Sequence, residues 1–403
     1  MTECKDQYRI VPGVRLGSTA AGIRYQGRDD LVVLELPADA TTAAVFTRNA
    51  FCAAPVVLAK QHLDLTQPRY LLINAGNANA GTGDQGLRDA MESCALLAVE
   101  TGAIPQQVLP FSTGVIGEHL AMERFMTGIP GALESLAEDG WVRASRAIMT
   151  TDTMPKLVSR PVLIGGREAV VTGMAKGAGM ICPNMATMLA FVASDAAVDG
   201  GLLQHCLAGA ADASFNAITI DGDTSTNDAC VLCAAGTLGN AVIDDEASAD
   251  YLAFRAAVEL VCGALATAIV RDGEGATKLV RVRVEEAVHR EEARRVAETV
   301  AHSPLVKTAL FASDPNWGRI LAAVGRAGVG DLDIGRVRIW LDDVPIVSDG
   351  GRAAGYTEQA GAAVMAEPEI LIRIALGRGQ VSTQLLTCDL SYEYVRINAE
   401  YRT

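Results

Sequence analysis

The run VLIGGREAVVTGMA places two apolar segments on either side of Gly165-Gly166. Two glycines between apolar runs are typical of a tight β-turn, because glycine adopts the positive φ angles that such a turn requires. The run therefore predicts a β-hairpin, in which two neighbouring strands run antiparallel. Any fold of this chain has to include that pair.

Helical and strand patterns alternate along the rest of the chain. The polar, glycine-rich stretch 73–86 leads into apolar positions at helical spacing, which are Leu87, Met91, Cys94, Ala95 and Ala98. A second helix, ending at DGEGATK, is predicted by Ala257, Leu260, Val261, Ala264, Leu265 and Ala268. Strands are predicted for FNAITI (215–220), ACVLCA (229–234), LVRVRV (279–284), RVRIWL (336–341), EILIRIAL (369–376) and YEYVRI (392–397). This mixture favours an α+β fold in layers, with mostly antiparallel sheets.

Composition limits the class of partner. The 403 residues carry a formal net charge of −14, whereas nucleic acids and anionic lipids select clustered Lys and Arg. We therefore expect small-molecule partners, with no nucleic acid and no membrane. The N-terminus lacks the apolar core of a secretory signal, and the most apolar helix candidate is short of a bilayer span and carries Glu259. Nine scattered cysteines suit a reducing cytoplasm, so a cytoplasmic protein is expected.

Several common chemistries lack their motifs. DGDTSTND begins like a calcium loop, but Thr226 stands where that loop needs Gly and Leu232 where it needs Glu. The chain has no P-loop, no G-x-S-x-G and no G-x-G-x-x-G that opens a βαβ unit. Cys230 and Cys233 form a single CxxC inside an apolar strand, and the five histidines are expected on the surface or as helix caps. No metal and no cofactor are expected.

A shortage of catalytic histidines raises the question of where a general base comes from. An α-amino group has a pKa of about 8, so near neutral pH part of it is unprotonated and can take a proton from a hydroxyl. A chain cut before a Thr carries nucleophile and base on one residue. Thr187 in KGAGMICPNMATMLAF has the surroundings for such a cut, with small Ala186 before it and Gly177 and Gly179 upstream. From spacing alone, a buried Thr in an apolar strand explains the same residues.

The motif KGAGMICPNMATML resembles the processing site of the ornithine acetyltransferase family, the glutamate N-acetyltransferases of arginine biosynthesis. Further strings that are similar to family signatures follow in the expected order over essentially the whole chain. These strings are STGVIG, AIMTTDTMPK, DGDTSTND, DGEGATK, SPLVKTA, DPNWGR and RINAEYRT.

The resemblance implies a layered αββα catalytic core over about residues 1–280 and a C-terminal α+β domain over about 281–403. It also implies that the chain cuts itself between Ala186 and Thr187, giving an α chain of 1–186 and a β chain of 187–403. Thr187 would attack the acetyl group of N2-acetyl-L-ornithine, with its own amine as base. Glutamate would then take the acetyl group from the threonine ester in a ping-pong reaction.

The family's site residues map onto this chain by motif. Thr113 and Gly114 in STGVIG are implied as the oxyanion hole, and a Gly-rich turn at a strand end is the alternative explanation of that string. Substrate contacts are implied at six positions, which are Thr150, Lys176, Thr187, Glu274, Asn398 and Thr403. Their charges suggest that Lys176 holds a carboxylate and that Glu274 holds the ornithine ammonium. Thr151, the neighbour of Thr150, is an alternative for that contact.

Partners follow from the same resemblance. The α and β chains of one precursor are expected to stay together, and two such pairs to form an α2β2 heterotetramer. Some members of the family also take acetyl-CoA as donor, and the sequence leaves open which type this chain is. Two other functions remain: an aminopeptidase or amidase that shares the self-cleaving layered fold and uses water as acceptor, and a metabolite-binding protein in which Thr187 is only packed.

Overall fold

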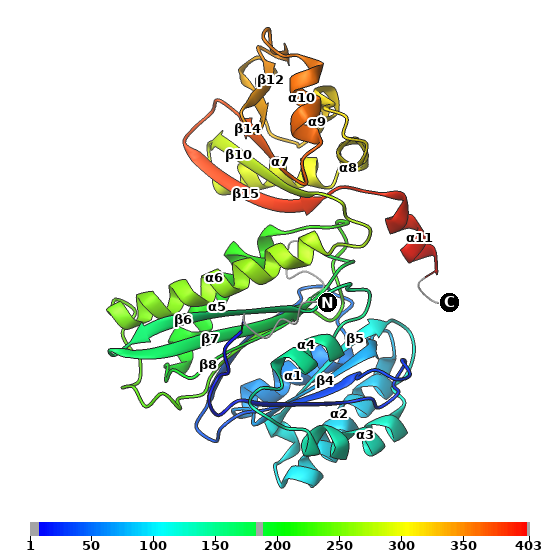
Figure 1. The fold of residues 1–403 in the computed structure, drawn as a ribbon, viewed down its shortest axis with the longest axis vertical. Coiled ribbons are helices and arrows are strands. Elements are labelled where there is room, and N and C mark those ends of the chain that lie inside the picture. Colours follow the sequence, from blue (N-terminus) through cyan, green and yellow to red (C-terminus); the bar gives the residue numbers. More distant parts are fainter. Residues whose placement is uncertain (1–7, 183–187, 401–403) are drawn as a thin grey trace. The chain divides into compact units, whose positions relative to one another are not determined.

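The computed structural model describes residues 8–182 and 188–400 (Figure 1). These residues form two compact units. Unit 1 contains residues 8–180, 188–216 and 223–269, and unit 2 contains residues 181–182, 217–222 and 270–400. Each unit has its own hydrophobic core, so each is described by itself.

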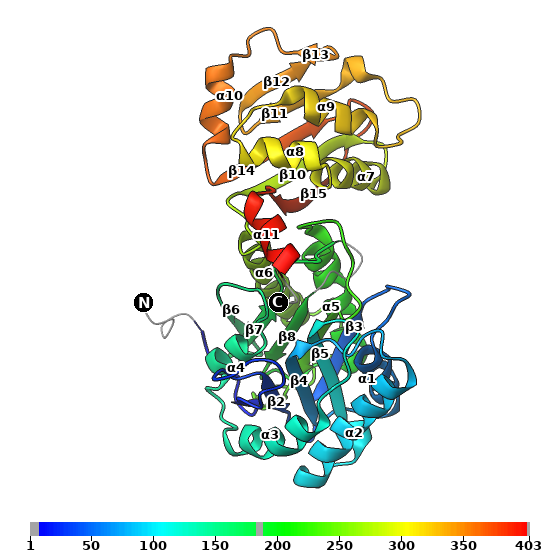
Figure 2. The ribbon, with the colours of Figure 1, turned by 90° about the vertical axis from the view of Figure 1, so that its right-hand side faces the viewer.

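Unit 1 contains a first sheet with the strand order β1-β2-β4-β5. Its strands are β1 (Arg15–Thr19), β2 (Leu31–Glu35), β4 (Tyr70–Asn77) and β5 (Val108–Val115). β4 and β5 are parallel, whereas the other pairs are antiparallel. Helices α1 (Ala54–Leu65), α2 (Gly83–Thr101) and α3 (Met122–Glu134) cover the outer face (Figure 2). On that face, strand residues such as Val33 and Leu72 pack with Leu97 and Phe125 of the helices.

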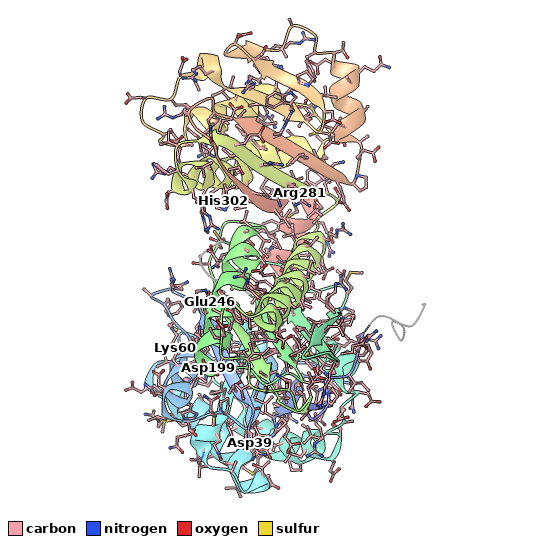
Figure 3. All side chains as sticks on the ribbon, turned by 90° about the vertical axis from the view of Figure 1, so that its left-hand side faces the viewer. Asp39, Lys60, Asp199, Glu246, Arg281 and His302 are labelled. Atoms are coloured by element: carbon pink, nitrogen blue, oxygen red, sulfur yellow. The ribbon has the colours of Figure 1, made fainter. Side chains whose placement is uncertain are left out.

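The second sheet of unit 1 has the order β3-β9-β8-β7-β6. Its strands are β3 (Thr41–Phe46), β9 (Ala229–Ala234), β8 (Leu189–Ser194), β7 (Arg167–Lys176) and β6 (Lys156–Ile164). The hairpin predicted around Gly165-Gly166 is confirmed as β6 and β7. Helices α5 (Gly200–Ala213) and α6 (Ala249–Arg271) cover this sheet, and Asp199, labelled in Figure 3, caps α5 by accepting from the amides of Gly201 and Leu202.

The two sheets pack face to face and share one core. Phe111 of β5 meets Phe191 of β8 edge to face, with ring centroids 5.1 Å apart. The core also takes Trp141 and Ala144 from α4 (Trp141–Ala147), which lies at the sandwich edge. Helices lie outside both sheets, so unit 1 is the layered αββα sandwich that was expected.

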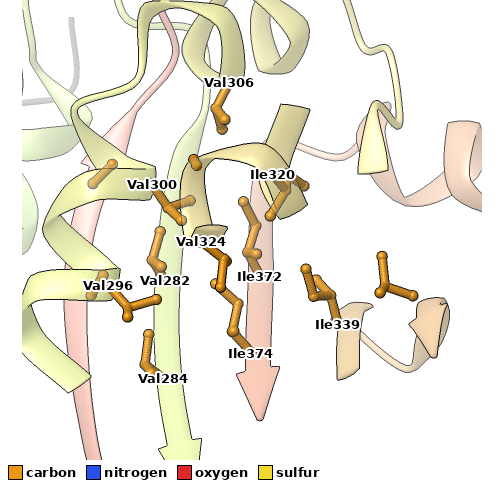
Figure 4. Close-up of a cluster of buried hydrophobic side chains, with 14 of the residues drawn as sticks. Val282, Val284, Val296, Val300, Val306, Ile320, Val324, Ile339, Ile372 and Ile374 are labelled. Atoms are coloured by element: carbon orange, nitrogen blue, oxygen red, sulfur yellow. The ribbon is translucent and has the colours of Figure 1, made fainter. Parts of the chain in front are cut away.

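Unit 2 is built on a six-stranded sheet with the order β13-β12-β11-β14-β10-β15. Its strands are β10 (Leu279–Ala287), β11 (Arg338–Leu341), β12 (Val344–Ser348), β13 (Gly351–Arg352), β14 (Glu369–Ala375) and β15 (Val381–Cys388). Its helices are α7 (Arg290–Ala301), α8 (Pro304–Phe311), α9 (Trp317–Gly325), α10 (Glu358–Met365) and α11 (Tyr392–Glu400). Valine and isoleucine side chains of β10, β14, α7 and α9 form its core (Figure 4).

Two predicted strands are wrong. YEYVRI lies in helix α11, where Arg396 forms ion pairs with Glu393 and Glu400 at helical spacing. FNAITI is a short 3-10 turn, Phe215–Ala217, followed by a buried link in which Ile218 makes a single bridge to Leu386. At 392–397 the local ion pairs favour the helix, whereas at 215–220 the tertiary link to Leu386 outweighs the short alternation in the sequence.

The predicted helices exist, but their buried faces differ from the prediction. Met91 of α2 is 52% exposed and Leu260 of α6 is 59% exposed. Small and polar residues such as Ala90 and Ser93 are buried in α2 instead, because the helix packs closely on its neighbours. The sheets are mostly antiparallel, as expected, and β4–β5, β8–β9 and β10–β14 are parallel pairs within them.

Helix α6 is longer than the sequence pattern indicated. Its 23 residues are long and apolar enough to cross a membrane by length and composition alone, and half of its most apolar window is buried inside the structure. Val261 and Leu265 of α6 pack on Gly173 of β7, which is typical of a core helix on a sheet.

Candidate functional site

The site in unit 1 begins at the end of β5, where Thr113 and Gly114 lie beside the end of β4. Gly114 has a φ of +136°, and a Cβ atom there would lie 2.2 Å from the carbonyl carbon of Gly76 and 2.5 Å from the amide nitrogen of Asn77. Real Cβ atoms do not approach backbone so closely, so only glycine fits. The two parallel strands therefore meet at this point with no side chain between them.

Lys176 joins the predicted residues of unit 1 into one cluster. It is the last residue of β7 and is only 4% exposed. Its Nζ donates to Thr113 Oγ1 at 3.1 Å and to Thr150 Oγ1 at 2.9 Å. Three residues from separate segments thus meet through one ammonium group. Because the Thr113 oxygen accepts from Lys176, the Thr113 hydroxyl hydrogen points elsewhere and is available to another acceptor.

Asp152 and Lys156 extend this cluster, and the sequence reasoning missed both. Asp152 Oδ1 accepts from Lys156 Nζ at 2.6 Å and from the amide of Gly177 at 2.7 Å. Asp152 Oδ2 accepts from the amide of Thr150 at 3.1 Å, which fixes the loop that carries Thr150. The Lys156 side chain is fully buried. The sequence pattern that could have revealed this pair is an acid and a lysine four residues apart in MTTDTMPK.

The cluster holds excess positive charge in a buried place. Burial by itself raises the pKa of the Asp152 carboxyl, but the charges of Lys176 and Lys156 and the Gly177 N–H outweigh it and lower that pKa to about 2. Asp152 is therefore ionised at neutral pH. One carboxylate facing two ammonium groups leaves a net positive field at Thr113, which favours a negative charge that develops nearby.

Asn227 and Asp228 hold the segment directly before β9 against its neighbours in unit 1. The second half of DGDTSTND, read from sequence as a polar turn, is buried from Ser225 onward. Asn227 Nδ2 donates to the carbonyls of Ala78 at 2.6 Å and Ser112 at 2.9 Å, so it ties the start of β9 to the ends of β4 and β5. Asp228 Oδ1 accepts from the amide of Met188 at 2.9 Å. The signal in the sequence was a polar pair directly before an apolar strand.

Unit 2 holds two further predicted residues. Glu274 is buried in the loop after α6, and its Oε2 accepts from Asn398 Nδ2 of α11 at 2.7 Å. Gly275, with a φ of +69°, allows this loop to pass close to Ser391 Oγ and the Tyr394 amide. Ser391 Oγ also donates to the Gly275 carbonyl at 2.6 Å. The structure thus brings Glu274 and Asn398 together, as a carboxylate and an amide from the two ends of this unit.

Three predicted residues, Ala186, Thr187 and Thr403, lie outside the described residues. Between the two threonines considered for one contact, it is Thr150 whose hydroxyl meets Lys176.

The CxxC of β9 is not arranged to share a ligand. Its two cysteines are three positions apart in a strand, so their side chains point to opposite faces. Cys233 lies in the core between the sheets and accepts from Thr42 Oγ1, whereas Cys230 faces Cys262 of α6. Burial raises the pKa of Cys233 to about 12, so this thiol stays protonated.

Comparison with known proteins agrees with the motifs. The model of the ArgJ family matches residues 15–403. An arginine biosynthesis bifunctional protein ArgJ of Methylococcus capsulatus is 60% identical over 393 residues, covering 98% of this chain and 96% of its own length. The protein of that name from Psychrobacter arcticus is 54% identical over 393 residues, covering 98% of this chain and 97% of its own.

Two solved structures are also similar. The arginine biosynthesis bifunctional protein of Bacillus halodurans is 39% identical, with a TM-score of 0.49 over 52% of this chain and 98% of that chain. The ornithine acetyltransferase of Mycobacterium tuberculosis, solved in complex with ornithine, is 31% identical, with a TM-score of 0.38 over 43% of this chain and 92% of that chain. Because the family model spans nearly the whole sequence and the relatives share more than half of its residues, the chain belongs to the ArgJ family and is an enzyme of that ornithine acetyltransferase family.

Proposed function

We propose that this enzyme cuts itself between Ala186 and Thr187 and then moves the acetyl group of N2-acetyl-L-ornithine to L-glutamate. In the first half-reaction the Thr187 hydroxyl oxygen attacks the acetyl carbonyl carbon while the Thr187 amine takes the hydroxyl proton. Ornithine leaves with that proton, and an acetyl-threonine ester remains. The amine of glutamate then attacks the ester, giving N-acetylglutamate and restoring the threonine.

The observation that carries this proposal is the buried contact between Lys176 and Thr113. In each half-reaction, negative charge builds on a carbonyl oxygen. The Thr113 hydroxyl and the Gly114 amide are suited to hold that oxygen, and the net positive charge of Lys176, Lys156 and Asp152 stabilises it. Lys176 was expected to bind a substrate carboxylate, and its burial and its two hydroxyl partners favour the oxyanion instead.

Glu274 and Asn398 are proposed to bind the amino-acid part of the substrate. A buried carboxylate suits the ornithine ammonium group, and the amide of Asn398 holds that carboxylate in place. The names of the two bacterial relatives refer to arginine biosynthesis, which is consistent with an ornithine-type substrate. Thr150, Thr187 and Thr403 complete the proposed substrate contacts.

The assembly is proposed as α2β2, in the cytoplasm, from α chains of residues 1–186 and β chains of 187–403. The catalytic core is proposed to span about residues 1–280 and the C-terminal domain about 281–403. No metal or cofactor enters the proposed steps.

The proposed function is tested by following ornithine release from acetylornithine with and without glutamate. An acetyl-threonine intermediate predicts one rapid equivalent of ornithine without glutamate and continuous turnover with it. Continuous release without glutamate would identify water as the acceptor and the enzyme as an amidase. A parallel assay with acetyl-CoA and glutamate tells whether acetyl-CoA is a second donor, as the word bifunctional in the relatives' names suggests.

A further inference from the structure

The loop that carries Glu274 is held by the segment that follows β15. Residues 272–278 link α6 to β10, and residues 389–391 link β15 to α11. β10 and β15 are antiparallel neighbours, with Leu279 opposite Cys388. The residues before Leu279 therefore lie beside the residues after Cys388, and the register of the sheet decides which of them meet.

Asp389 supplies three hydrogen bonds between these two links. Its side chain is buried, with 3% exposed. Its Oδ1 accepts from the amides of Thr277 at 2.8 Å and Lys278 at 2.9 Å, and its Oδ2 accepts from the Thr277 hydroxyl at 2.6 Å. One buried carboxyl group thus fixes the backbone of the loop at its end next to β10.

Ser391 holds the same loop at Gly275, directly after Glu274. Its Oγ donates to the Gly275 carbonyl at 2.6 Å and accepts from the amide of Glu393, in the first turn of α11, at 3.2 Å. A Cβ atom on Gly275 would lie 2.9 Å from the Glu393 Cβ, so the loop passes tightly against the helix. The loop and the start of α11 are therefore held together through residues 389–391.

Lys307 supports this segment from α8. It is buried, with 4% exposed, and its Nζ donates to the Thr387 hydroxyl at 3.1 Å and to the Cys388 carbonyl. The Lys307 carbonyl accepts from the Leu390 amide at 3.2 Å. The residues on both sides of Asp389 are thus anchored to α8. This gives a role to SPLVKTA, a motif that the proposed function does not use.

The position of the Glu274 carboxylate depends on this arrangement. Glu274 lies in the loop, whereas Asn398, whose amide donates to Glu274 Oε2 at 2.7 Å, lies in α11. The two side chains meet only when the loop and the helix are aligned. A charged group that is displaced by about 1 Å loses much of its interaction with a substrate, so the residue that aligns the loop affects binding without touching the substrate.

We infer that Asp389 is a positioning residue for the substrate ammonium group, and that it acts by holding the loop that carries Glu274. The inference rests on the proposed function, in which Glu274 binds the ornithine ammonium. Acetylornithine has a side-chain ammonium group, whereas glutamate has a side-chain carboxylate in its place. Asp389 therefore acts in the half-reaction of acetylornithine and has no part in that of glutamate.

The test measures kcat/KM for each substrate, because in a ping-pong reaction these two constants report the two half-reactions separately. For Asp389→Ala we expect kcat/KM for acetylornithine to fall about 10-fold, the scale of a lost hydrogen bond to a charged group. The constant for glutamate should keep its wild-type value. Asp389→Asn keeps Oδ1 for both amides and can donate to the Thr277 hydroxyl, so it should recover most of the loss.

Glu292→Ala is the matched control. Glu292 is a buried carboxylate of the same unit, with 6% exposed, and its Oε1 accepts from the Val288 amide at 3.3 Å beyond the other end of β10. This variant should be less stable than the wild-type enzyme, with both constants unchanged. Should Asp389→Ala be unfolded at the assay temperature, Ser391→Ala removes the bond to the Gly275 carbonyl and should lower the acetylornithine constant alone, by about threefold.

Equal falls in both constants for Asp389→Ala, or no fall in either, would overturn the inference. No recovery in Asp389→Asn would assign the effect to charge and contradict the positioning role. In the double variant Glu274→Gln/Asp389→Ala the loss should not exceed that of Glu274→Gln alone, and additive losses would also count against it.

Glu274→Gln separates this inference from the proposed function. A fall in the acetylornithine constant for Glu274→Gln, with none for Asp389→Ala, rejects the role of Asp389 and leaves the proposed function standing. No fall for Glu274→Gln rejects the proposed ammonium site itself.

Discussion

Lys176 is the residue that connects the site in unit 1, because its ammonium group reaches both Thr113 and Thr150. A free lysine on the surface would bind a substrate carboxylate as a point charge. A buried lysine with two hydroxyl partners and a nearby carboxylate instead orients those hydroxyls. The Thr113 hydroxyl is in this way directed as a donor before any substrate binds.

Thr113→Val tests that donor, since valine keeps the shape of threonine and lacks the hydroxyl. We expect kcat to fall by about 10² to 10³-fold, the usual effect of losing one oxyanion-hole donor. The KM for acetylornithine should change little, because the lost interaction is made with the charge of the transition state. Steady-state kinetics would measure both constants, and a rise in KM with kcat unchanged would assign Thr113 to substrate binding.

Asp152→Asn tests the charge balance of the same cluster. Asp152 has a folded-state pKa of about 2, below its ordinary value of 3.8. Its ionised form therefore stabilises the fold above about pH 4, and this contribution of about 2 kcal/mol is lost as the pH falls toward 2. At neutral pH the variant should lose roughly 3 to 5 kcal/mol, because two buried ammonium groups lose their carboxylate.

Unfolding in urea at a series of pH values measures this effect. The difference in unfolding free energy between wild type and Asp152→Asn should be constant from neutral pH to about pH 4 and should shrink below it. A difference that stays constant in acid would mean that Asp152 does not carry the charge assigned to it.

At the scale of elements, the site depends on how β5 ends against β4. The parallel pairing becomes irregular at Gly76 and Asn77, and Gly114 faces that irregularity. Asn227 closes the same corner from β9 through its two carbonyl partners, Ala78 and Ser112. Backbone from three strands thus converges where Thr113 and Gly114 lie.

Gly114→Ala should disrupt this corner, and Gly117→Ala is its control. Both glycines have positive φ, +136° and +89°, so both substitutions are strained. A Cβ on Gly117 meets no atom within 4 Å, whereas one on Gly114 would meet the Gly76 backbone. Thermal unfolding should show a small loss for Gly117→Ala, about 1 kcal/mol, and a loss of several times that for Gly114→Ala. Equal losses would contradict the close approach of β4 and β5.

Local sequence patterns predicted those elements in which local and tertiary preferences agree. The hairpin predicted around Gly165-Gly166 is present. Residues 279–284 and 229–234 form the strands that their patterns predicted. The segment 392–397 alternates equally well and is helical, because alternation over six residues does not exclude a helix with ion pairs. The strand predicted for residues 215–220 is wrong, because this segment is buried through a single bridge between Ile218 and Leu386. No local sequence pattern indicates that bridge.

The candidate site was predictable by motif and only partly by chemistry. Lys176 and Glu274 were found as charges, but their partners Thr113 and Asn398 are far away in sequence, and no spacing rule joins them. Asp152 and Lys156 lie in AIMTTDTMPK, and Asp228 lies in DGDTSTND. Their burial, however, depends on the sandwich that encloses them. The residue types can be identified in the sequence. Which of them have a shifted pKa depends on burial, which only the fold determines.

At the scale of the whole molecule, the proposed cut falls between strands of one sheet. The order β3-β9-β8-β7-β6 places β8 and β9 of the proposed β chain between β3 and β7 of the proposed α chain. Hydrogen bonds of β8 to β7 and of β9 to β3 would therefore hold the two products together after the peptide bond is broken. Separation of the chains requires unfolding of the sandwich, so a native enzyme of unchanged size is expected after cleavage.

The most direct test of the central claim is intact mass spectrometry of the purified enzyme under denaturing conditions, before and after incubation with acetylornithine in the absence of glutamate. The account predicts two chains, 1–186 and 187–403, and the gain of one acetyl group on the second chain alone, which glutamate then removes. An active enzyme that remains one uncut chain, or a β chain that acquires no acetyl group while ornithine is released, would contradict it.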